Sequence, residues 1–360
     1  MGLTRLRPLA LGSLLVALGG CVAGSAPPLP APVAAAGSPA PVSPLAPATS
    51  PAPNPLAPAG SPTRPPNPAS VRANELGLVP VLMYHQVVPK PKGVYDRTPA
   101  DFRAELERLA REGYVPVTAD AYARGELDVP AGRHPVVLTF DDSTSSQLTL
   151  DQDGEPLPDT AVGVLLDVAR QRPGFPAVAT FFVNGDPFSE PGGQRTLRWL
   201  QTHGFEVANH TLTHANLRQL PPAQVQRELA ADVAAIREAV PEAPVRTLAL
   251  PFGVWPRDRA LAVQGASGGT SYEHRGVFLV GSNPAPSPYA ARFEPHAIPR
   301  VRSQAGTGPE ASFGSTAWLD KLAKSPGTRY TSDGDPARIS FPKDRAAGLD
   351  PAYAQRAAAY

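Results

Sequence analysis

The chain has 360 residues, a formal net charge of +1 and only 18% charged residues. This balance leaves no basic surplus to neutralise phosphates, so we expect no nucleic-acid partner. Many of the 46 prolines lie near the N-terminus, and the roughly 280 residues beyond them are enough for one large domain.

The first 21 residues are typical of an export signal. Two arginines precede a short apolar run, residues 9–18, and the only cysteine, Cys21, follows two glycines. The run is too short to span a bilayer but suits a signal peptide. This segment resembles the lipobox of bacterial lipoproteins, which implies a lipidated Cys21 and an exported protein anchored to the bacterial cell membrane or outer membrane. The alternative is an ordinary secretory signal cut near Ala26.

Residues 22–71 are mostly Pro, Ala, Ser and Gly. They carry almost no charge and no periodic apolar face, so they cannot bury enough surface to offset chain entropy. Proline-rich segments favour extended conformations. We therefore predict a disordered stalk over 22–71, a folded domain over 72–302 and a packed C-terminal extension over 303–360, in which Asp333-Gly334 is the turn of one hairpin.

Strands and helices alternate after the stalk. Apolar runs predict strands at 78–87, 134–140, 177–183, 205–210, 247–253 and 274–281, and amphipathic patterns predict helices at 97–114, 159–172, 194–204 and 221–240. Continuous apolar strands between helices favour a parallel sheet covered by helices. An open doubly wound sheet and a closed barrel both fit, and both place ligands at the carboxyl ends of the strands.

Two of those strand ends carry groups that suit a metal ion. Asp141 and Asp142 follow the strand at 134–140, and His210 and His214 follow the strand at 205–210. Both carboxylates can enter one site only if the strand ends between them and the chain turns at Asp142. If the segment 210–214 forms a helical turn, both imidazoles lie on one face. Two histidines and one carboxylate form an open zinc site, with Asp142 as the ligand and Asp141 free to move protons.

These groups are those of amide or ester hydrolysis. A metal lowers the pKa of water and polarises a carbonyl oxygen, and Asp141 beside it suits a general base. The reaction also needs a proton donor and a backbone N–H that faces the oxyanion. The stretch Leu250–Gly253 contains Pro251, which stiffens the backbone, and offers the N–H groups of Phe252 or Gly253.

The motifs "TFDD", "HTLTH" and "LPFG" resemble, in order, three motifs of the polysaccharide deacetylase family, the NodB-homology carbohydrate esterases. The resemblance covers residues 79–302. It implies a distorted (β/α) barrel of about seven parallel strands and a divalent metal, most often Zn²⁺. It also implies removal of acetyl groups from N-acetylhexosamine polymers. Carried over, Asp141 is the general base, Asp142, His210 and His214 are the ligands, and Phe252, next to Pro251, supplies the oxyanion N–H.

The sequence departs from the family pattern in its remaining motifs. Ala249 stands where the family has an arginine that pairs with the base, and Arg300 is a candidate replacement from another strand end. The tryptophan-containing fourth motif has no match. The fifth motif, which supplies the general acid, is also missing, and we predict His296 in its place, with His85 as the alternative.

We therefore expect a metal-dependent carbohydrate N-deacetylase that acts as a monomer on peptidoglycan or an exopolysaccharide. An O-acetyl esterase on the same fold is one alternative. A non-catalytic carbohydrate-binding lipoprotein is another: the missing arginine and acid favour it, whereas the intact base and ligand set argue against it.

Overall fold

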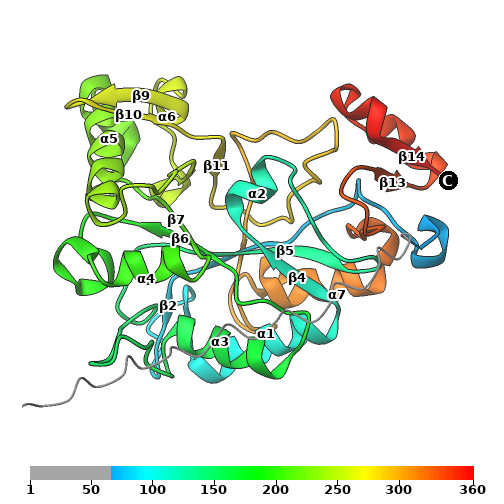
Figure 1. Cartoon of the computed structure of the whole chain (residues 1–360), viewed down its shortest axis with the longest axis horizontal. Coiled ribbons are helices and arrows are strands. Elements are labelled where there is room, and N and C mark those ends of the chain that lie inside the picture. The colour runs from blue at the N-terminus through cyan, green and yellow to red at the C-terminus, as the bar shows by residue number, and fades with distance from the viewer. Residues whose placement is uncertain (1–65) are drawn as a thin grey trace, which may run out of the picture. The chain divides into compact units, whose positions relative to one another are not determined.

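A computed structural model describes residues 66–360 (Figure 1). The predicted signal segment with Cys21 and most of the predicted stalk lie outside the described residues. Among the helices of 66–360, none combines the length and apolar character needed to cross a membrane.

The centre of the domain is an eight-stranded parallel sheet. Its strands are β1 (Val81–Tyr84), β4 (Tyr114–Val117), β5 (His134–Phe140), β6 (Thr180–Val183), β7 (Glu206–Asn209), β8 (Thr247–Ala249), β11 (Gly276–Phe278) and β12 (Val301–Arg302). The order is β11-β8-β7-β6-β5-β1-β12, and β4 pairs with the first half of β5 while β6 pairs with the second half. The six strands expected from the sequence are all present, although β4 and β12 were not predicted.

The sheet curls into a distorted barrel, and the chain before β12 joins its two edges. Val277 of β11 donates its N–H to Pro295 O, and Ile298 donates its own to Val277 O, each at 2.9 Å. Three residues later, Val301 pairs with Leu82 of β1. The segment from Pro295 to Val301 therefore runs along β11 and then enters the sheet beside β1.

Alternate residues of each strand face two separate cores. On β5, Val136, Leu138 and Phe140 pack outward with the helices, whereas Val137 belongs to the inner cluster with Phe182. Because side chains alternate along a strand, Asp141 continues the inward row of Val137 and Thr139. The periodicity of β5 thus carries a charged residue to the mouth of the barrel.

Helices cover the outside of the sheet (Figure 1). They are α1 (Pro99–Arg111), α2 (Ala119–Ala123), α3 (Ala161–Gln171), α4 (Thr196–Thr202), α5 (Pro222–Ala239), α6 (Ala260–Val263) and α7 (Ser315–Lys324). Thr98 is the N-cap of α1: its hydroxyl accepts the N–H of Asp101 at 3.0 Å. Two small strand pairs lie outside the barrel, β2 (Gln86–Val87) with β3 (Asp96–Arg97) and the hairpin β9 (Gln264–Ser267) with β10 (Thr270–Glu273).

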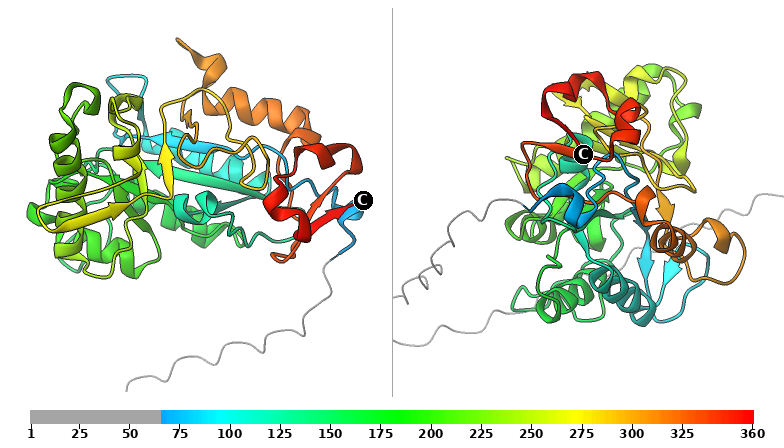
Figure 2. Two further views of the ribbon diagram at one scale, coloured as in Figure 1. Left: turned by 90° about the horizontal axis from the view of Figure 1, so that it is seen from above. Right: turned by 90° about the vertical axis from the view of Figure 1, so that its right-hand side faces the viewer.

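The C-terminal extension packs on the first described residues, as Figures 1 and 2 show. Thr331 bridges Asn74, and the buried carboxylate of Glu75 accepts the N–H of Ser340 at 2.7 Å. The predicted hairpin around Asp333-Gly334 is wrong, because β13 (Ile339–Phe341) pairs in parallel with β14 (Ala357–Ala359). The residues before Asp333 are instead engaged with the N-terminal segment.

Candidate metal centre and catalytic carboxylate

The end of β5 divides the two adjacent carboxylates in the way the sequence predicts. The strand ends at Phe140, and the next residues turn, with φ of 73° at Asp142 and 45° at Ser143. These left-handed values are uncommon outside glycine, and aspartate is among the residues that tolerate them best. The turn lets both Asp141 and Asp142 reach the carboxyl-end face of the sheet.

Asp142, His210 and His214 lie together at this face. Each offers one ligand atom, and the three atoms lie within 4.8 Å of one another. Oδ1 of Asp142 is 3.3 Å from Nε2 of His210 and 3.4 Å from Nε2 of His214. We call these three residues the metal trio.

The loop that carries the two histidines is a non-helical turn, so the helical turn that would place both imidazoles on one face does not form. Thr211 and His214 have left-handed φ values of 66° and 54°. The backbone N–H groups bond to side chains in place of a helical ladder: Thr211 donates to Asn209 Oδ1 at 2.8 Å, and Thr213 donates to Glu228 Oε2 at 3.0 Å. Side-chain acceptors of this kind compete with helix formation.

The chemistry of the trio fits a divalent cation such as Zn²⁺. Nδ1 of His210 lies 2.8 Å from the carbonyl oxygen of Ala249, which fixes the proton on Nδ1 and leaves Nε2 with a lone pair toward Asp142. Oδ1 of Asp142 is buried and has no hydrogen-bond partner among residues 66–360. A buried acceptor that faces two imidazole nitrogens is explained by a cation between them.

Asp141 is buried and forms a bidentate pair with Arg300. Nη1 and Nη2 of Arg300 lie 2.6 and 2.7 Å from the two oxygens of Asp141, and the arginine is 0% exposed. Burial alone would raise the pKa of Asp141, but the Arg300 guanidinium outweighs it and holds that pKa well below its usual range. Arg300 therefore pairs with Asp141, the role for which it was a candidate because Ala249 stands where the family has an arginine.

His85 is a further neighbour of Asp141. Its Nε2 is 4.0 Å from Oδ2 of Asp141, and its buried Nδ1 has no hydrogen-bond partner in the described part of the chain. Burial lowers the pKa of His85, whereas the neighbouring carboxylates oppose that shift. Tyr95 packs edge-on against this imidazole, with 4.8 Å between ring centroids, and is 40% exposed.

Phe252 borders the trio at His214. Its ring is 60% exposed and lies 4.6 Å from the ring of His214, centroid to centroid. The backbone of Phe252 is left-handed, with φ of 58°, and Pro251 before it is buried. The segment predicted to face the oxyanion therefore lies beside the metal trio.

The structure does not bring His296 to this cluster. His296 is exposed and lies close to His274, whose pKa it lowers together with burial. His296 lies in a turn in which Ala297 donates its N–H to Glu294 O at 2.9 Å, and it lines a pocket with Trp255. Arg300, four residues later, pairs with Asp141 instead.

Sequence reasoning also missed side chains that support the site. Asn184 donates from Nδ2 to the carbonyl oxygens of His210 and Thr211, both at 2.8 Å. Asp232 is fully buried on α5 and accepts the N–H of His210 at 3.2 Å. The available signals were an asparagine directly after an apolar strand and a single acidic residue on the apolar stripe of α5.

Comparison with known proteins gives this arrangement a family. Residues 128–267 match the family model for polysaccharide deacetylase. The chain is 33% identical over 145 residues to a chitooligosaccharide deacetylase of Bradyrhizobium sp. (strain ANU 289), which covers 40% of this chain and 57% of the relative. It is 35% identical over 127 residues to the chitooligosaccharide deacetylase of Sinorhizobium fredii, covering 35% of this chain and 51% of the relative.

A solved structure agrees at the level of the fold. It is a Bacillus anthracis protein assigned to the polysaccharide deacetylases, with 19% sequence identity, a TM-score of 0.50, and coverage of 67% of this chain and 69% of that one. The matches to the two chitooligosaccharide deacetylases span a little more than half the length of each relative. Residues 128–267, which contain Asp141, Asp142, His210, His214 and Phe252, form a domain of the polysaccharide deacetylase family.

Proposed function

We propose that this chain is a metal-dependent carbohydrate deacetylase that hydrolyses the acetamido groups of an N-acetylhexosamine polymer. The observation that carries the proposal is the juxtaposition of two different carboxylate environments. Oδ1 of Asp142 faces the imidazoles of His210 and His214 and accepts no hydrogen bond from residues 66–360. Asp141, the preceding residue, is held ionised by Arg300.

Asp142, His210 and His214 would hold the cation. A bound divalent cation supplies Lewis acidity, which lowers the pKa of water and polarises an acyl oxygen. Asp141 stays outside this ligand set because Arg300 occupies both of its oxygens. The pairing fixes the orientation of the carboxylate and keeps it unprotonated at neutral pH, which is the state that a general base requires.

His85 is our candidate for the proton donor to the leaving amine. It is the histidine outside the trio that lies beside Asp141, at 4.0 Å, so a proton taken up at Asp141 has a short path to it. Burial lowers the pKa of His85 and the neighbouring carboxylates oppose that shift; when protonated, the imidazole donates from both ring nitrogens. This assignment replaces our expectation for His296.

A sugar polymer is favoured by the surroundings of the site and by the relatives. The exposed rings of Phe252 and Tyr95 flank the trio and His85, and aromatic faces suit the apolar faces of sugars. Two relatives named chitooligosaccharide deacetylase share 33% and 35% identity with this chain. The N-terminal sequence supports export and lipid anchoring at Cys21 as part of the proposal.

Acetate release tests the proposal. The protein is incubated with N-acetylated chitooligosaccharides and, separately, with O-acetylated xylan, beside its Asp141→Asn variant. Acetate from the chitooligosaccharides that Asp141→Asn does not release supports the proposed reaction. Acetate from xylan alone would assign the site to ester hydrolysis, and acetate from neither would favour a binding protein.

A further inference from the structure

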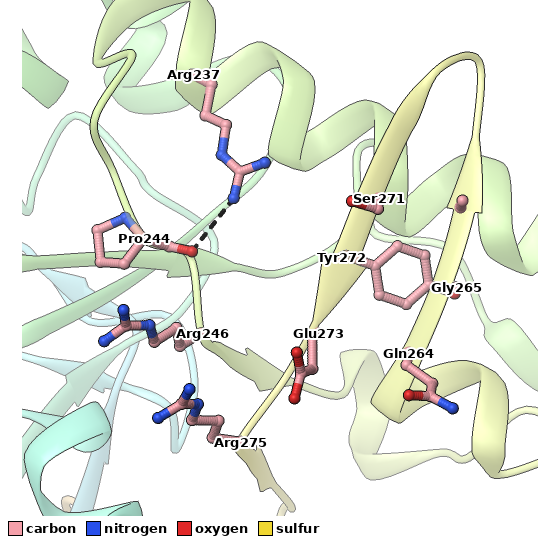
Figure 3. A pocket seen from close by; sticks show the side chains of 10 residues that line it. Arg237, Pro244, Arg246, Gln264, Gly265, Ser271, Tyr272, Glu273 and Arg275 are labelled. Carbon is pink, nitrogen blue, oxygen red and sulfur yellow. Dashed lines mark hydrogen bonds between the residues drawn. The ribbon is translucent and has the colours of Figure 1, made fainter.

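A cavity lies at the amino ends of β8 and β11. The metal trio lies at the carboxyl-end face of the sheet, away from this cavity. The cavity measures about 750 Å³ and lies between the end of α5, the strand starts and the hairpin β9–β10. Figure 3 shows its lining, which includes Arg237, Arg246 and Arg275 and one carboxylate, Glu273. The lining thus carries three positive charges against one negative.

Two of the arginines are forced into proximity by strand register. Thr247 of β8 pairs with Gly276 of β11, so the preceding residues, Arg246 and Arg275, are neighbours, and Arg275 donates its N–H to Arg246 O at 2.6 Å. Their side chains extend alongside one another in Figure 3. Like charges at neighbouring positions of a sheet repel each other and destabilise it.

Carboxylates relieve only part of this repulsion. Over residues 66–360, neither Arg237 nor Arg275 has a carboxylate within ion-pair distance. Arg246 has Asp120 at 3.7 Å, but Asp120 also accepts from Arg124 at the shorter distance of 3.1 Å. The positive charge in the cavity is therefore largely uncompensated.

The third arginine is held in place by backbone carbonyls. Arg237, near the end of α5, donates from Nε to Ala243 O at 3.3 Å and from Nη2 to Pro244 O at 3.4 Å, and Figure 3 shows the second of these contacts. These bonds limit the rotamers of a long side chain before any ligand arrives. A fixed guanidinium loses less conformational entropy on binding an anion.

We propose that this cavity binds a phosphate group. A tetrahedral oxyanion presents several oxygens in different directions, so it can accept from guanidinium groups that arrive from a helix and two strands. A carboxylate presents its two oxygens in one plane, so it offers acceptors in fewer directions than a tetrahedral phosphate. Gln264 and Ser271 in the lining add uncharged donors. The ligand class is phosphate, either free or as a monoester or diester, such as the phosphodiesters of phospholipids and glycans.

Isothermal titration calorimetry on the full chain at low salt tests this site. The probes are inorganic phosphate and glycerophosphoglycerol, a soluble diester. The test variants are Arg275→Gln and the pair Arg246→Gln/Arg275→Gln. The matched control is Arg227→Gln, because Arg227 is an exposed arginine on α5 outside the cavity.

We expect saturable binding of at least one probe, unchanged in the control and weakened about tenfold or more in the double variant, a change of about 1.4 kcal/mol. Tighter binding of phosphate assigns a monoester or free phosphate, and tighter binding of the diester assigns a phosphodiester. The double variant should melt no lower than the parent by circular dichroism, since it loses a repulsion. No saturable binding of either probe, or equal affinity in the parent and the well-folded Arg275→Gln and double variants, would overturn the site.

Discussion

Replacing Arg300 with methionine tests how the protein keeps Asp141 ionised. Methionine is an unbranched side chain that fills much of the same space without a charge. The substitution leaves a carboxylate that is 2% exposed without the two hydrogen bonds of 2.6 and 2.7 Å that it now accepts. Breaking a buried ion pair by removing one partner costs about 3–5 kcal/mol, so we expect a loss of this size in the free energy of unfolding near neutral pH.

The contribution of Asp141 to the pH dependence of stability should have opposite signs in the parent and in Arg300→Met. In the parent, the folded pKa of Asp141 is depressed, so its contribution is present above the unfolded pKa, about 3.9, and is lost as pH falls through the lower folded value. In Arg300→Met, burial remains while the guanidinium is gone, so the folded pKa rises above the unfolded one. The variant should therefore lose stability as pH rises from the acid range toward neutrality.

Urea unfolding of the full chain at pH 5 and pH 8 measures both effects. Arg302→Met is the control, because Arg302 pairs with the exposed Glu310 and should cost less than about 1 kcal/mol. The double variant Asp141→Asn/Arg300→Met should recover part of the loss at pH 8, since no buried charge remains. If Arg300→Met costs no more than the control and the double variant recovers nothing, the account of Asp141 is refuted.

Further predictions concern the site itself. His214→Ala should lower bound zinc, measured by atomic absorption, together with acetate release; full zinc retention would remove His214 from the ligand set. Asp141→Asn should retain zinc but lose at least about 100-fold in kcat, and normal turnover would contradict its role as base. His85→Gln should lower kcat about 100-fold or more with unchanged zinc, whereas His296→Gln should leave kcat within twofold; the reverse pattern would restore His296. Phe252→Ala should raise KM for chitooligosaccharides without changing the melting temperature, because its ring is 60% exposed; an unchanged KM would exclude a sugar contact.

The barrel strands and the trio were predictable because both follow from local patterns. Continuous apolar runs such as 134–140 admit only a strand buried on both faces, and polar residues directly after such runs collect at one edge. The split between Asp141 and Asp142 required only alternation of side chains and a turn. No helical turn forms at 210–214, because the side chains of Asn209 and Glu228 accept N–H groups of this loop. Glu228 lies too far along the chain for a local pattern to indicate this.

The partner of Asp141 could be proposed from the sequence but not placed by it. Arg300 and His296 are four residues apart, and no local pattern shows where the chain enters the barrel. That point is set by the pairing of Ile298 with β11 and of Val301 with β1, both of which are non-local. The short strands β4 and β12 were missed for a related reason, since two to four residues carry little periodic signal.

The most direct test of the account is acetate release from N-acetylated chitooligosaccharides before chelation, after removal of metal, and after zinc is restored. We predict release that disappears with the chelator and returns with zinc in the parent protein, while Asp142→Ala fails to recover. Release that persists in a protein shown to be metal-free would contradict the claim that Asp142, His210 and His214 hold a catalytic cation.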